Sequence, residues 1–341
     1  MRVQPLAPDR HAAWDAFVQA CPEAGFTHLS GWREVIERAF GHRTHYLLAE
    51  DDDGGIRGVL PLAEVRSRLF GYHLVSTPFC VYGGPAAVDD VAYSALAGAA
   101  CDLARALGVD DLELRNLRAH HPDWPAKDLY VRFRKAIDPD PEVNLKAIPR
   151  KQRAMVRKGI KAGLEAEESR AIDRFFPIYA ESVRNLGTPV FGRRFFQVLW
   201  EVFGEHARIL MVRHQGRDIA GVLSFYFRDE VLPYYGGSLP EARVLKGNDF
   251  MYWELMRRSA LEGIRWFDYG RSKVGTGAYH FKKNWGFEPE PLAYEYCLVR
   301  AREIPQVNPN NPKYRHFIDL WRRLPLPVAN ALGPRLAKYL G

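Results

Sequence analysis

The chain has 341 residues, of which 47% are hydrophobic and 26% charged, and its formal net charge is +7. These values are typical of a globular protein and exclude a wholly disordered chain or collagen-like repeats. No stretch approaches the about 20 apolar residues of a membrane helix, and the first thirty residues lack the apolar core of a signal peptide. At roughly 100–200 residues per domain, the length predicts two domains. We expect a cytoplasmic protein.

The four cysteines stand singly, without a CxxC pair, at positions 21, 80, 101 and 297. Neither a disulfide framework nor a metal site is therefore expected. The positive charge is concentrated, because residues 142–163 carry +6 and residues 302–341 carry +5, which leaves −4 for the rest. Such local excess favours an anionic partner at defined places.

An order of elements in the first half of the chain returns in the second. In the first half, the predicted order is a helix at 30–40, a hairpin at 45–62, a strand at 80–85, a helix that ends at Gly108 and a strand at 112–115. In the second half, the predicted order is a helix at 194–203, a hairpin at 208–227, a strand at 233–238, a helix that ends at Gly263 and a strand at 266–269. Corresponding glycines are about 153–155 residues apart, which indicates a duplicated α/β unit. The alternative is two unrelated α/β domains with similar turns.

A basic helix is predicted between the two copies. Pro149 suits its first turn, and cations at spacings of three and four share one face. These residues are Arg150, Arg153, Arg157 and Lys161. Met155, Val156 and Ile160 are expected to pack on the other side. After residue 301, the sequence 317–324 predicts a short amphipathic helix that Pro325 and Pro327 end.

The segment from 267 to 289 is the candidate site. A predicted strand reaches Tyr269, and glycines then follow at positions 270, 275, 277 and 286. Cations and hydroxyls lie among them, and exposed amides with cations favour an anion. The alternative is a flexible basic loop, which the aromatic residues Phe281, Trp285 and Phe287 argue against.

This segment resembles the FemAB-like branch of the GNAT acyltransferase superfamily. The matching residues are Asp268, Gly270-Arg271-Ser272, Gly275-Thr276-Gly277, Phe281-Lys282 and Trp285-Gly286. The helix start at Lys246 and the basic helix fit as well. The tail, with Asn311-Pro-Lys-Tyr-Arg and Trp321-Arg-Arg-Leu-Pro-Leu, resembles the subgroup associated with PEP-CTERM/exosortase exopolysaccharide systems.

The resemblance implies an α/β (α+β) fold of two tandem GNAT-like domains, each a mixed, mostly antiparallel sheet flanked by helices. The first domain is expected at 1–141, a basic linking helix at 142–165, the second domain with the main site at 166–300, and a basic Pro-rich tail at 301–341. The first copy lacks the Gly-Arg-Ser segment, so we expect it to shape the acceptor site.

The implied activity is transfer of an acyl or aminoacyl group to an amine, on a cell-envelope glycan or a peptidoglycan or exopolysaccharide precursor. The donor would be acyl-CoA or aminoacyl-tRNA as co-substrate, with no tightly bound cofactor. The sequence departs from the pattern of the family in two places. The GNAT pyrophosphate signature is absent, since Arg243-Val-Leu-Lys-Gly-Asn stands at about its place, and there is no heptad pair for the coiled-coil arm of bridge-forming enzymes.

Asp268 is the candidate to orient or deprotonate the amine, and its alternative is a structural salt bridge with Arg271. Tyr235 and Tyr279 are candidate proton donors, and sheet packing is the alternative for one of Tyr234 and Tyr235. Donor or substrate binding is expected from Tyr234, Gly237, Lys246, Arg271, Ser272, Lys273, Gly275, Thr276, Gly277 and Lys282.

Two other function classes remain open. One is a tRNA-binding protein that uses the basic helix, for which no known reading module is present. The other is a non-catalytic scaffold that docks on an anionic membrane through its tail, at the inner face. No DNA partner is expected. His120 and His121 are interpreted as loop residues, and Cys80 is not expected to be a nucleophile.

Overall fold

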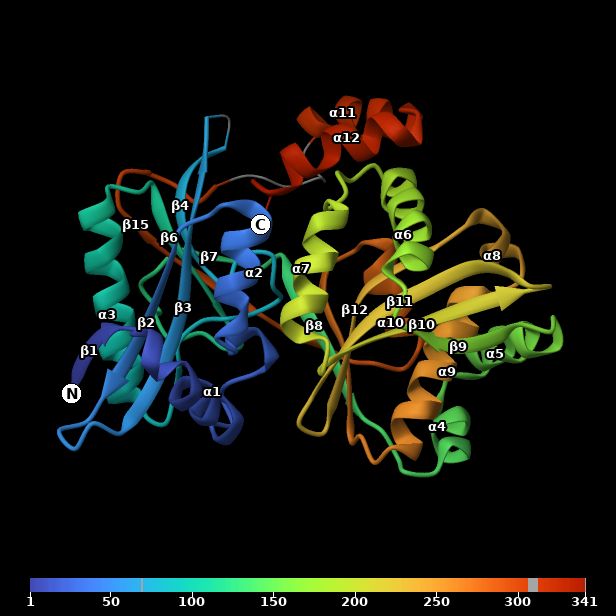
Figure 1. Cartoon of the computed structure of the whole chain (residues 1–341), viewed down its shortest axis with the longest axis horizontal. Helices are drawn as coiled ribbons and strands as arrows, with labels where there is room; N and C mark the ends of the chain where they lie inside the picture. The colour runs from blue at the N-terminus through green and yellow to red at the C-terminus, as the bar shows by residue number, and fades with distance from the viewer. Residues whose placement is uncertain (69, 306–311, 341) are drawn as a thin grey trace. The chain divides into compact units, whose positions relative to one another are not determined.

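The computed structural model describes residues 1–68, 70–305 and 312–340. The chain divides into two compact units (Figure 1). The first contains residues 1–130, 291–307 and 338–341, and the second contains residues 131–290 and 308–337. Each unit is built on one sheet with helices packed against it.

The strands of the first unit are β1 (Arg2–Pro5), β2 (Thr44–Glu50), β3 (Ile56–Ser67), β4 (Gly71–Ser76), β5 (Ala86–Ala87), β6 (Asp111–Asn116), β7 (Ala126–Lys127) and β15 (Ala293–Leu298). Its helices are α1 (His11–Ala20), α2 (Gly31–Phe40) and α3 (Asp90–Leu107), with short 3-10 turns at Pro8–Arg10 and Phe26–His28. The sheet order is β1-β2-β3-β4-β6-β15-β7, with β5 beside β3.

Helix α3 shows how local sequence builds this unit. Asp89 caps its start by accepting a hydrogen bond from the Ala92 backbone N–H at 2.8 Å, and Gly108 ends it in the left-handed conformation that favours glycine. Leu96, Ala100 and Ala104 recur every four residues and are fully buried against the sheet. The core of the first unit lies between this helix face and the sheet.

The strands of the second unit are β8 (Tyr130–Ala136), β9 (Glu165–Ser169), β10 (Ala207–His214), β11 (Arg217–Phe227), β12 (Glu230–Ser238), β13 (Trp266–Lys273) and β14 (Pro289–Pro291). Its helices are α4 (Pro141–Ala147), α5 (Arg150–Lys161), α6 (Ile172–Leu186), α7 (Arg193–Phe203), α8 (Pro240–Val244), α9 (Gly247–Leu261), α10 (Gly277–Asn284), α11 (Pro312–Arg323) and α12 (Leu326–Ala337). The sheet order is β14-β8-β13-β12-β11-β10-β9.

Helices cover both faces of the second sheet. Neighbouring residues of a strand point to opposite faces. A Cβ atom added at Gly236 would lie 3.1 Å from the Tyr252 hydroxyl of α9, whereas one at Gly237 would lie 2.6 Å from the Cα of Tyr179 in α6. Helices α9 and α6 therefore pack on opposite faces of β12. The main core includes Val156, Met251 and Phe267 and lies on the α9 side.

The two sheets repeat one pattern, which confirms the predicted duplication. In the first, β1, β2, β3 and β4 pair antiparallel in turn, and β4 then pairs parallel with β6. In the second, β9, β10, β11 and β12 pair antiparallel in turn, and β12 pairs parallel with β13. The fold is thus α/β with two tandem units of mixed, mostly antiparallel sheet.

The last strand of each copy is exchanged. Strand β8 follows β6 and the short β7 in sequence but lies beside β13 in the second sheet, and β15 follows β13 and the short β14 but lies beside β6 in the first. The units therefore differ from the ranges 1–141 and 166–300 predicted above, and the basic helix α5 belongs to the second unit. Turn and periodicity signals report local structure, so they do not reveal which sheet a strand joins.

Two further expectations change. Residues 80–85, predicted as a strand, form a loop after β4, whereas the corresponding residues 233–238 do lie in a strand. The tail is also more ordered than expected, because α11 and α12 form a helical pair that packs on α6 (Figure 1). Pro325 separates the two helices as predicted, but Pro327 lies inside α12. Residues 306–311, which include the Asn311 of the tail motif, lie outside the described residues.

No helix among the described residues has both the length and the apolarity that crossing a membrane would require.

Candidate functional site

Strands β12 and β13 diverge in the second unit. They pair in parallel only at Glu230 with Trp266 and at Val231 with Phe267, although β12 continues to Ser238 and β13 to Lys273. Backbone N–H and C=O groups beyond a last strand pair need other partners. This divergence is therefore a place where a ligand can meet backbone groups.

A β-bulge lies in the diverging part of β12. The register with β11 pairs Leu223 with Tyr235 and Ser224 with Pro233, so Tyr234 is the additional residue. A bulge bends its strand and re-aims the side chain, which is why bulges are common beside active sites. The Tyr234 side chain is half-buried, whereas Tyr235 is buried.

The chain returns from β12 to the first turn of α9 through the short helix α8. Lys246 caps α9 with φ of 62°, a left-handed conformation. A Cβ atom at Gly247 would lie 2.9 Å from Ala242, so glycine is needed for this close turn. The first N–H groups of a helix favour an anion, and half-buried Lys246 and exposed Arg243 stand beside them.

The Gly-Thr-Gly motif forms the turn from β13 into α10. Thr276 is the N-cap of α10, where its hydroxyl donates to the Lys273 carbonyl at 2.8 Å and accepts from the Tyr279 N–H at 3.4 Å. Gly275 has φ of 76° and is exposed, and Gly277 is exposed with no atom within 4 Å of an added Cβ. The motif thus has a clear capping role and leaves two glycines open to solvent.

Lys282 does not fit the predicted role in binding the donor. Its ammonium group donates to the carbonyls of Tyr269, Gly270 and Arg271 at 2.7, 3.3 and 2.9 Å. An ammonium has three hydrogens to donate, so these contacts occupy all of them. Burial lowers the pKa of Lys282 to about 8. Lys282 therefore fastens α10 to the end of β13.

Asp268 forms a buried ion pair with Arg132, a residue that lies far from it in the sequence. One carboxylate oxygen accepts from Arg132 Nε at 2.8 Å, and the other accepts from the Gly270 N–H at 2.7 Å. The carboxylate is fully buried. A general base must reach the proton that it removes. Burial and these contacts argue against direct proton transfer by Asp268 and favour the structural alternative, with Arg132 as the partner.

The ion pair extends across three neighbouring strands. Arg132 on β8 also contacts Glu230 on β12 at 3.3 Å, and Arg134 contacts the same Glu230 oxygen at 2.5 Å. Burial, followed by the charge of Asp268, raises the pKa of Glu230. Because β8 comes from the first half of the sequence, this network fixes the exchanged strand in the second sheet.

Tyr235 and Tyr279 differ from the proton donors that were predicted. The Tyr235 ring is surrounded edge-on by the rings of Tyr179, Phe195 and Phe196 at 5.3–6.1 Å, which is a packing position. Tyr279 lies on α10, half-buried, with its ring 5.5 Å from Phe133. Gly237 serves the close approach of α6 described above rather than that of a ligand.

Two buried hydroxyls on β13 lack a hydrogen-bond partner among the described residues. These are Ser272 Oγ and Tyr269 Oη. A buried polar group without a partner is rare and calls for an explanation such as water or a ligand. Ser272 is one of the residues predicted to bind the donor, whereas Tyr269 was missed because a strand tyrosine reads as core from sequence.

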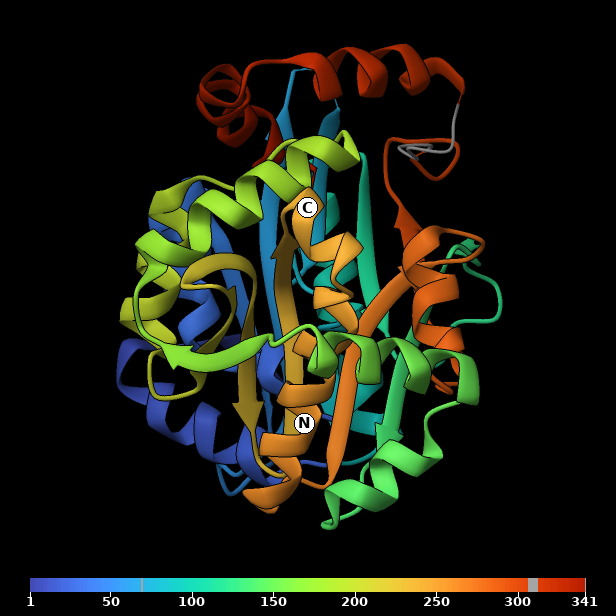
Figure 2. The same cartoon turned by 90° about the vertical axis from the view of Figure 1, so that its right-hand side faces the viewer.

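The basic helix α5 presents its cations to solvent. Arg150, Arg157 and Lys161 are exposed, and Arg153 is half-buried with a hydrogen bond to the Lys146 carbonyl at 2.9 Å. Its inner face packs on α9 (Figure 2), where a Cβ atom at Gly159 would lie 2.8 Å from Phe250. Val156 is buried as expected, but Ile160 is exposed.

In the first unit, the place equivalent to the divergence is filled by the chain itself. After the last pair of β4 and β6, Gly83 and Gly84 donate their N–H groups to the Arg115 carbonyl at 3.1 and 3.0 Å. A Cβ atom at Gly84 would lie 1.9 Å from Asn116 Oδ1, so glycine is required there. The loop 77–85 thus replaces any ligand beside β6.

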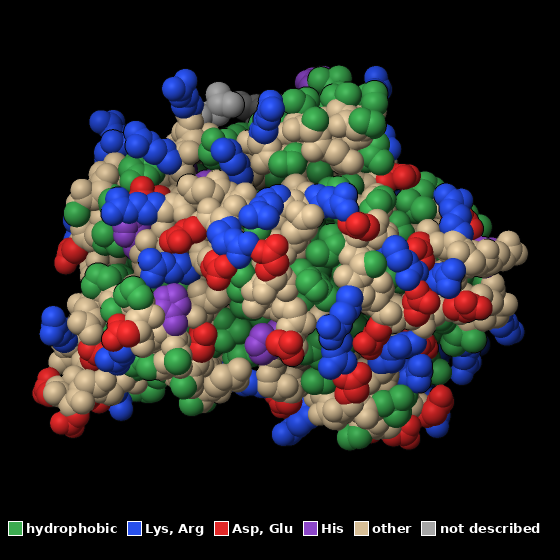
Figure 3. Space-filling model, viewed as in Figure 1, with side chains coloured by type: hydrophobic (Ala, Val, Ile, Leu, Met, Phe, Trp, Pro, Cys, Tyr) green, Lys and Arg blue, Asp and Glu red, His purple; other side chains and the backbone are tan. Residues whose placement is uncertain are grey.

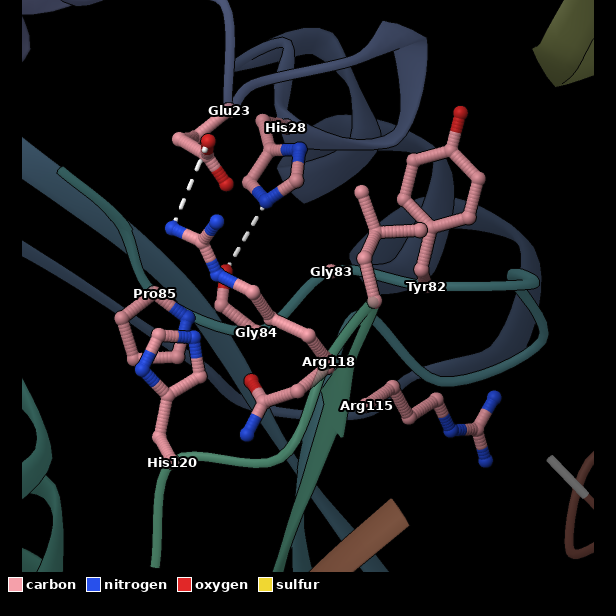
Figure 4. A pocket seen from close by; sticks show the side chains of 11 residues that line it. Glu23, His28, Tyr82, Gly83, Gly84, Pro85, Arg115, Arg118 and His120 are labelled. Carbon is pink, nitrogen blue, oxygen red and sulfur yellow. Dashed lines mark hydrogen bonds and ion pairs between the residues drawn. The ribbon is translucent and has the colours of Figure 1, made fainter. Parts of the chain in front are cut away.

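A small pocket remains beside this loop (Figure 4). Glu23 and Arg118 form an ion pair of 3.5 Å at it, and His28 Nε2 bonds the Gly84 carbonyl at 2.9 Å. The Gly25 N–H donates to His28 Nδ1, so His28 donates through Nε2. Groups that already bind one another thus line part of this pocket, and none of the residues predicted to bind the donor lies at it.

His120 and His121 lie in a loop, as interpreted from sequence. Their N–H groups bind the buried Glu295 carboxylate at 2.7–3.2 Å, and their rings stack on Tyr93 and Trp124. Within the described residues, no group of three His, Cys, Asp or Glu side chains could hold a metal ion.

Comparison with known proteins places these observations in a class. Residues 150–283 match the sequence model of the acetyltransferase (GNAT) domain, and this range includes the diverging strands and the basic helix. No curated protein sequence matches the chain significantly.

Solved structures share the fold at low identity. FemX is 16% identical, with a TM-score of 0.67 over 86% of this chain and 97% of that chain. The C-terminal domain (DUF2156) of a putative lysylphosphatidylglycerol synthetase from Agrobacterium fabrum is 13% identical, with a TM-score of 0.54 over 84% and 91%. A tandem GNAT protein from the clavulanic acid biosynthesis pathway is 14% identical, with a TM-score of 0.51 over 86% and 97%.

The fold and the domain match define the protein as an acyltransferase with a GNAT domain. Within that class, it has the tandem, FemAB-like arrangement that it shares with FemX.

Proposed function

We propose that the protein transfers an acyl group from a thioester of coenzyme A to a primary amine, and that the donor binds between β12 and β13. The observation that carries this proposal is the divergence of these strands next to a bulge at Tyr234, inside the range that matches the GNAT domain. The first unit fills the equivalent place with its own loop, so a single donor site is proposed.

The parts of the donor correspond to distinct features. Its amide-bearing arm would pair with backbone groups of β12 beyond Val231 in the manner of an added strand. Its phosphates would meet the first N–H groups of α9 together with Lys246 and Arg243. Ser272 Oγ, which is buried and has no hydrogen-bond partner within the described part of the chain, and the exposed Gly275 and Gly277 complete the binding groups in this proposal.

The chemistry needs close approach and stabilisation of a developing negative charge. The amine nitrogen attacks the thioester carbonyl carbon, and the carbonyl becomes a tetrahedral oxyanion. When this intermediate collapses, the carbon–sulfur bond breaks and the thiolate leaves with the proton of the Tyr234 hydroxyl. The proton that the nitrogen loses passes through solvent water and restores this hydroxyl. We assign the bulge the role of placing backbone donors at the oxyanion, and the half-buried Tyr234 hydroxyl that of protonating the thiolate.

The acceptor in this proposal is an amine on a cell-envelope glycan or a peptidoglycan or exopolysaccharide precursor. This choice rests on the resemblance to FemAB-like proteins and to the subgroup associated with PEP-CTERM/exosortase systems. The chemistry itself requires only that the amine be unprotonated and able to reach the thioester carbon.

Aminoacyl-tRNA is the second candidate donor. The observation that favours it is the row of exposed cations on α5, namely Arg150, Arg157 and Lys161, which could bind phosphates in a salt-dependent manner. Replacing Arg157 and Lys161 by Glu would weaken the binding of aminoacyl-tRNA and leave that of acyl-CoA unchanged.

Thermal unfolding with a panel of donors tests the proposal. Acetyl-CoA, longer acyl-CoAs and aminoacyl-tRNAs are added separately, and a ligand that binds only the folded state raises Tm. We expect acyl-CoA to raise Tm, Arg243→Ala to reduce the rise, and Arg265→Ala, an exposed arginine elsewhere in the same unit, to leave it unchanged. A rise in Tm with aminoacyl-tRNA alone would make aminoacyl-tRNA the donor instead of acyl-CoA, and no rise with either ligand would refute the proposal.

A further inference from the structure

The helical pair α11 and α12 leaves an apolar face uncovered. Its inner side is anchored on α6, where Trp321 is buried and Arg184 donates to the Leu324 carbonyl at 3.1 Å. Gly187 permits the contact, since an added Cβ would lie 2.5 Å from Ile318. The pair is therefore held in place on the second unit, and its outer side is a fixed surface.

Large apolar side chains cover that outer side. Phe317, Leu320, Val328 and Leu332 are 41%, 63%, 41% and 41% exposed. Helix α12 has a single charged residue, Arg335, in its twelve positions, although it lies on the surface. In the space-filling view, apolar side chains gather over these helices, whereas Lys and Arg are interspersed with Asp and Glu over the lower part of the face shown (Figure 3). A surface helix of this kind normally buries its apolar face against something.

Arginines accompany this apolar face. Arg323 and Arg335 are exposed beside it, and the one acid of α11, Asp319, forms an ion pair with Arg322 at 3.5 Å. Apolar side chains flanked by arginines suit a layer that offers hydrocarbon below and negative charge above. Each helix has twelve residues and so spans about 18 Å at 1.5 Å per residue, which is too short to cross a bilayer and suits a position in its surface.

We propose that the outer face of α11 and α12 docks on a membrane surface rich in anionic phospholipid, with Phe317, Leu320, Val328 and Leu332 entering the layer below the headgroups. Arg323 and Arg335 then contact lipid phosphates. This inference is independent of the donor and of the residues proposed for catalysis. It goes beyond acyl transfer because it brings the second unit to acceptors that are attached to lipids.

Flotation with vesicles tests the proposal on the full chain. Phosphatidylcholine vesicles are compared with vesicles in which roughly a third of the lipid is phosphatidylglycerol. We expect binding to the anionic vesicles that weakens as salt is raised. The double variant Leu320→Asp/Leu332→Asp should lower the partition coefficient at least about tenfold, because two side chains that left water are replaced by charges.

Matched variants make the result specific. Leu261→Asp changes a leucine of α9 with the same exposure, 62% against 63% for Leu320, and should float like the wild type. Arg157→Glu/Lys158→Glu on α5 should also float like the wild type. Far-UV circular dichroism and Tm confirm that each variant is folded, and acyl transfer to a soluble amine should not differ between the Leu320/Leu332 variant and the wild type.

Three results would overturn the proposal. The first is wild-type protein that stays off anionic vesicles. The second is binding that the α5 variant loses while the Leu320→Asp/Leu332→Asp variant keeps it. The third is a dimer in solution that the Leu320→Asp/Leu332→Asp variant converts to a monomer, which would assign the apolar face to a second copy of the chain.

Discussion

Variants of the buried pair of Arg132 and Asp268 distinguish a structural role of Asp268 from a catalytic one. Replacing Arg132 by Met removes the cation that contacts the fully buried Asp268 carboxylate at 2.8 Å and Glu230 at 3.3 Å. Removing one partner of a buried pair costs about 3–5 kcal/mol, because the other charge is left without compensation. We expect the lower end of this range, since Arg134 still contacts Glu230 and the Gly270 N–H still binds Asp268.

The pH dependence of the stability of Arg132→Met, and the effect of a second substitution on it, identify the cause of the lost stability. A carboxylate that burial leaves without its cation regains stability when it is protonated, so the difference in stability between Arg132→Met and the wild type should narrow as the pH falls from neutrality. Replacing both partners, in Arg132→Met/Asp268→Leu, should recover most of the loss, because paired apolar side chains replace buried ion pairs at little cost.

Thermal and urea unfolding, followed by circular dichroism, measure these effects. We also expect that Asp268→Asn loses stability and that its folded fraction keeps its turnover within about tenfold. An Arg132→Met variant as stable as the wild type would refute the structural role. An Asp268→Asn variant with unchanged Tm and turnover reduced by about 10²–10⁴ would restore Asp268 as the base.

Three further predictions concern the same unit. Lys282→Met should lower Tm, because it loses the hydrogen bonds to three carbonyls of β13, and its acyl-CoA affinity by calorimetry should be unchanged. A weaker affinity at unchanged Tm would restore Lys282 as a donor-binding residue. Gly237→Ala should cost about 1–3 kcal/mol in urea unfolding, because its Cβ meets the Tyr179 backbone at 2.6 Å, and an equal loss in Gly236→Ala would contradict this reason. Burial raises the pKa of Glu230, so its ionised form costs stability at neutral pH, and part of this stability is regained as the pH falls and Glu230 is protonated. Glu230→Gln should therefore gain less stability on acidification than the wild type, and an identical dependence of stability on pH in the two proteins would contradict this reason.

Local signals predicted much of the fold. The glycines at 41 and 108 end α2 and α3 with φ of 72° and 64°, as their positions suggested, and the order of elements in the two copies identified the duplication. Helix ends and hairpins depend on residues close in sequence, which a single sequence displays directly.

Interactions between distant residues were not predictable in the same way. The exchange of β8 and β15 depends on pairing between strands from different halves of the chain, and Arg132 lies 136 positions from Asp268. The motif 267–289 correctly marked a specialised turn, but its most prominent charges, Asp268 and Lys282, proved to bind protein groups. A charge in a motif indicates that it has a partner and does not indicate whether that partner is a ligand.

Amide hydrogen exchange tests the central claim that the donor binds between the diverging strands. Exchange is measured with and without a saturating acyl-CoA, and peptides that cover 232–238 and 268–273 are compared with peptides from the corresponding loop 77–85 of the first unit. We predict that acyl-CoA slows exchange at 232–238 and at the first turn of α9 and leaves 77–85 unchanged. Binding that protects 77–85, or protects neither segment, would contradict the account.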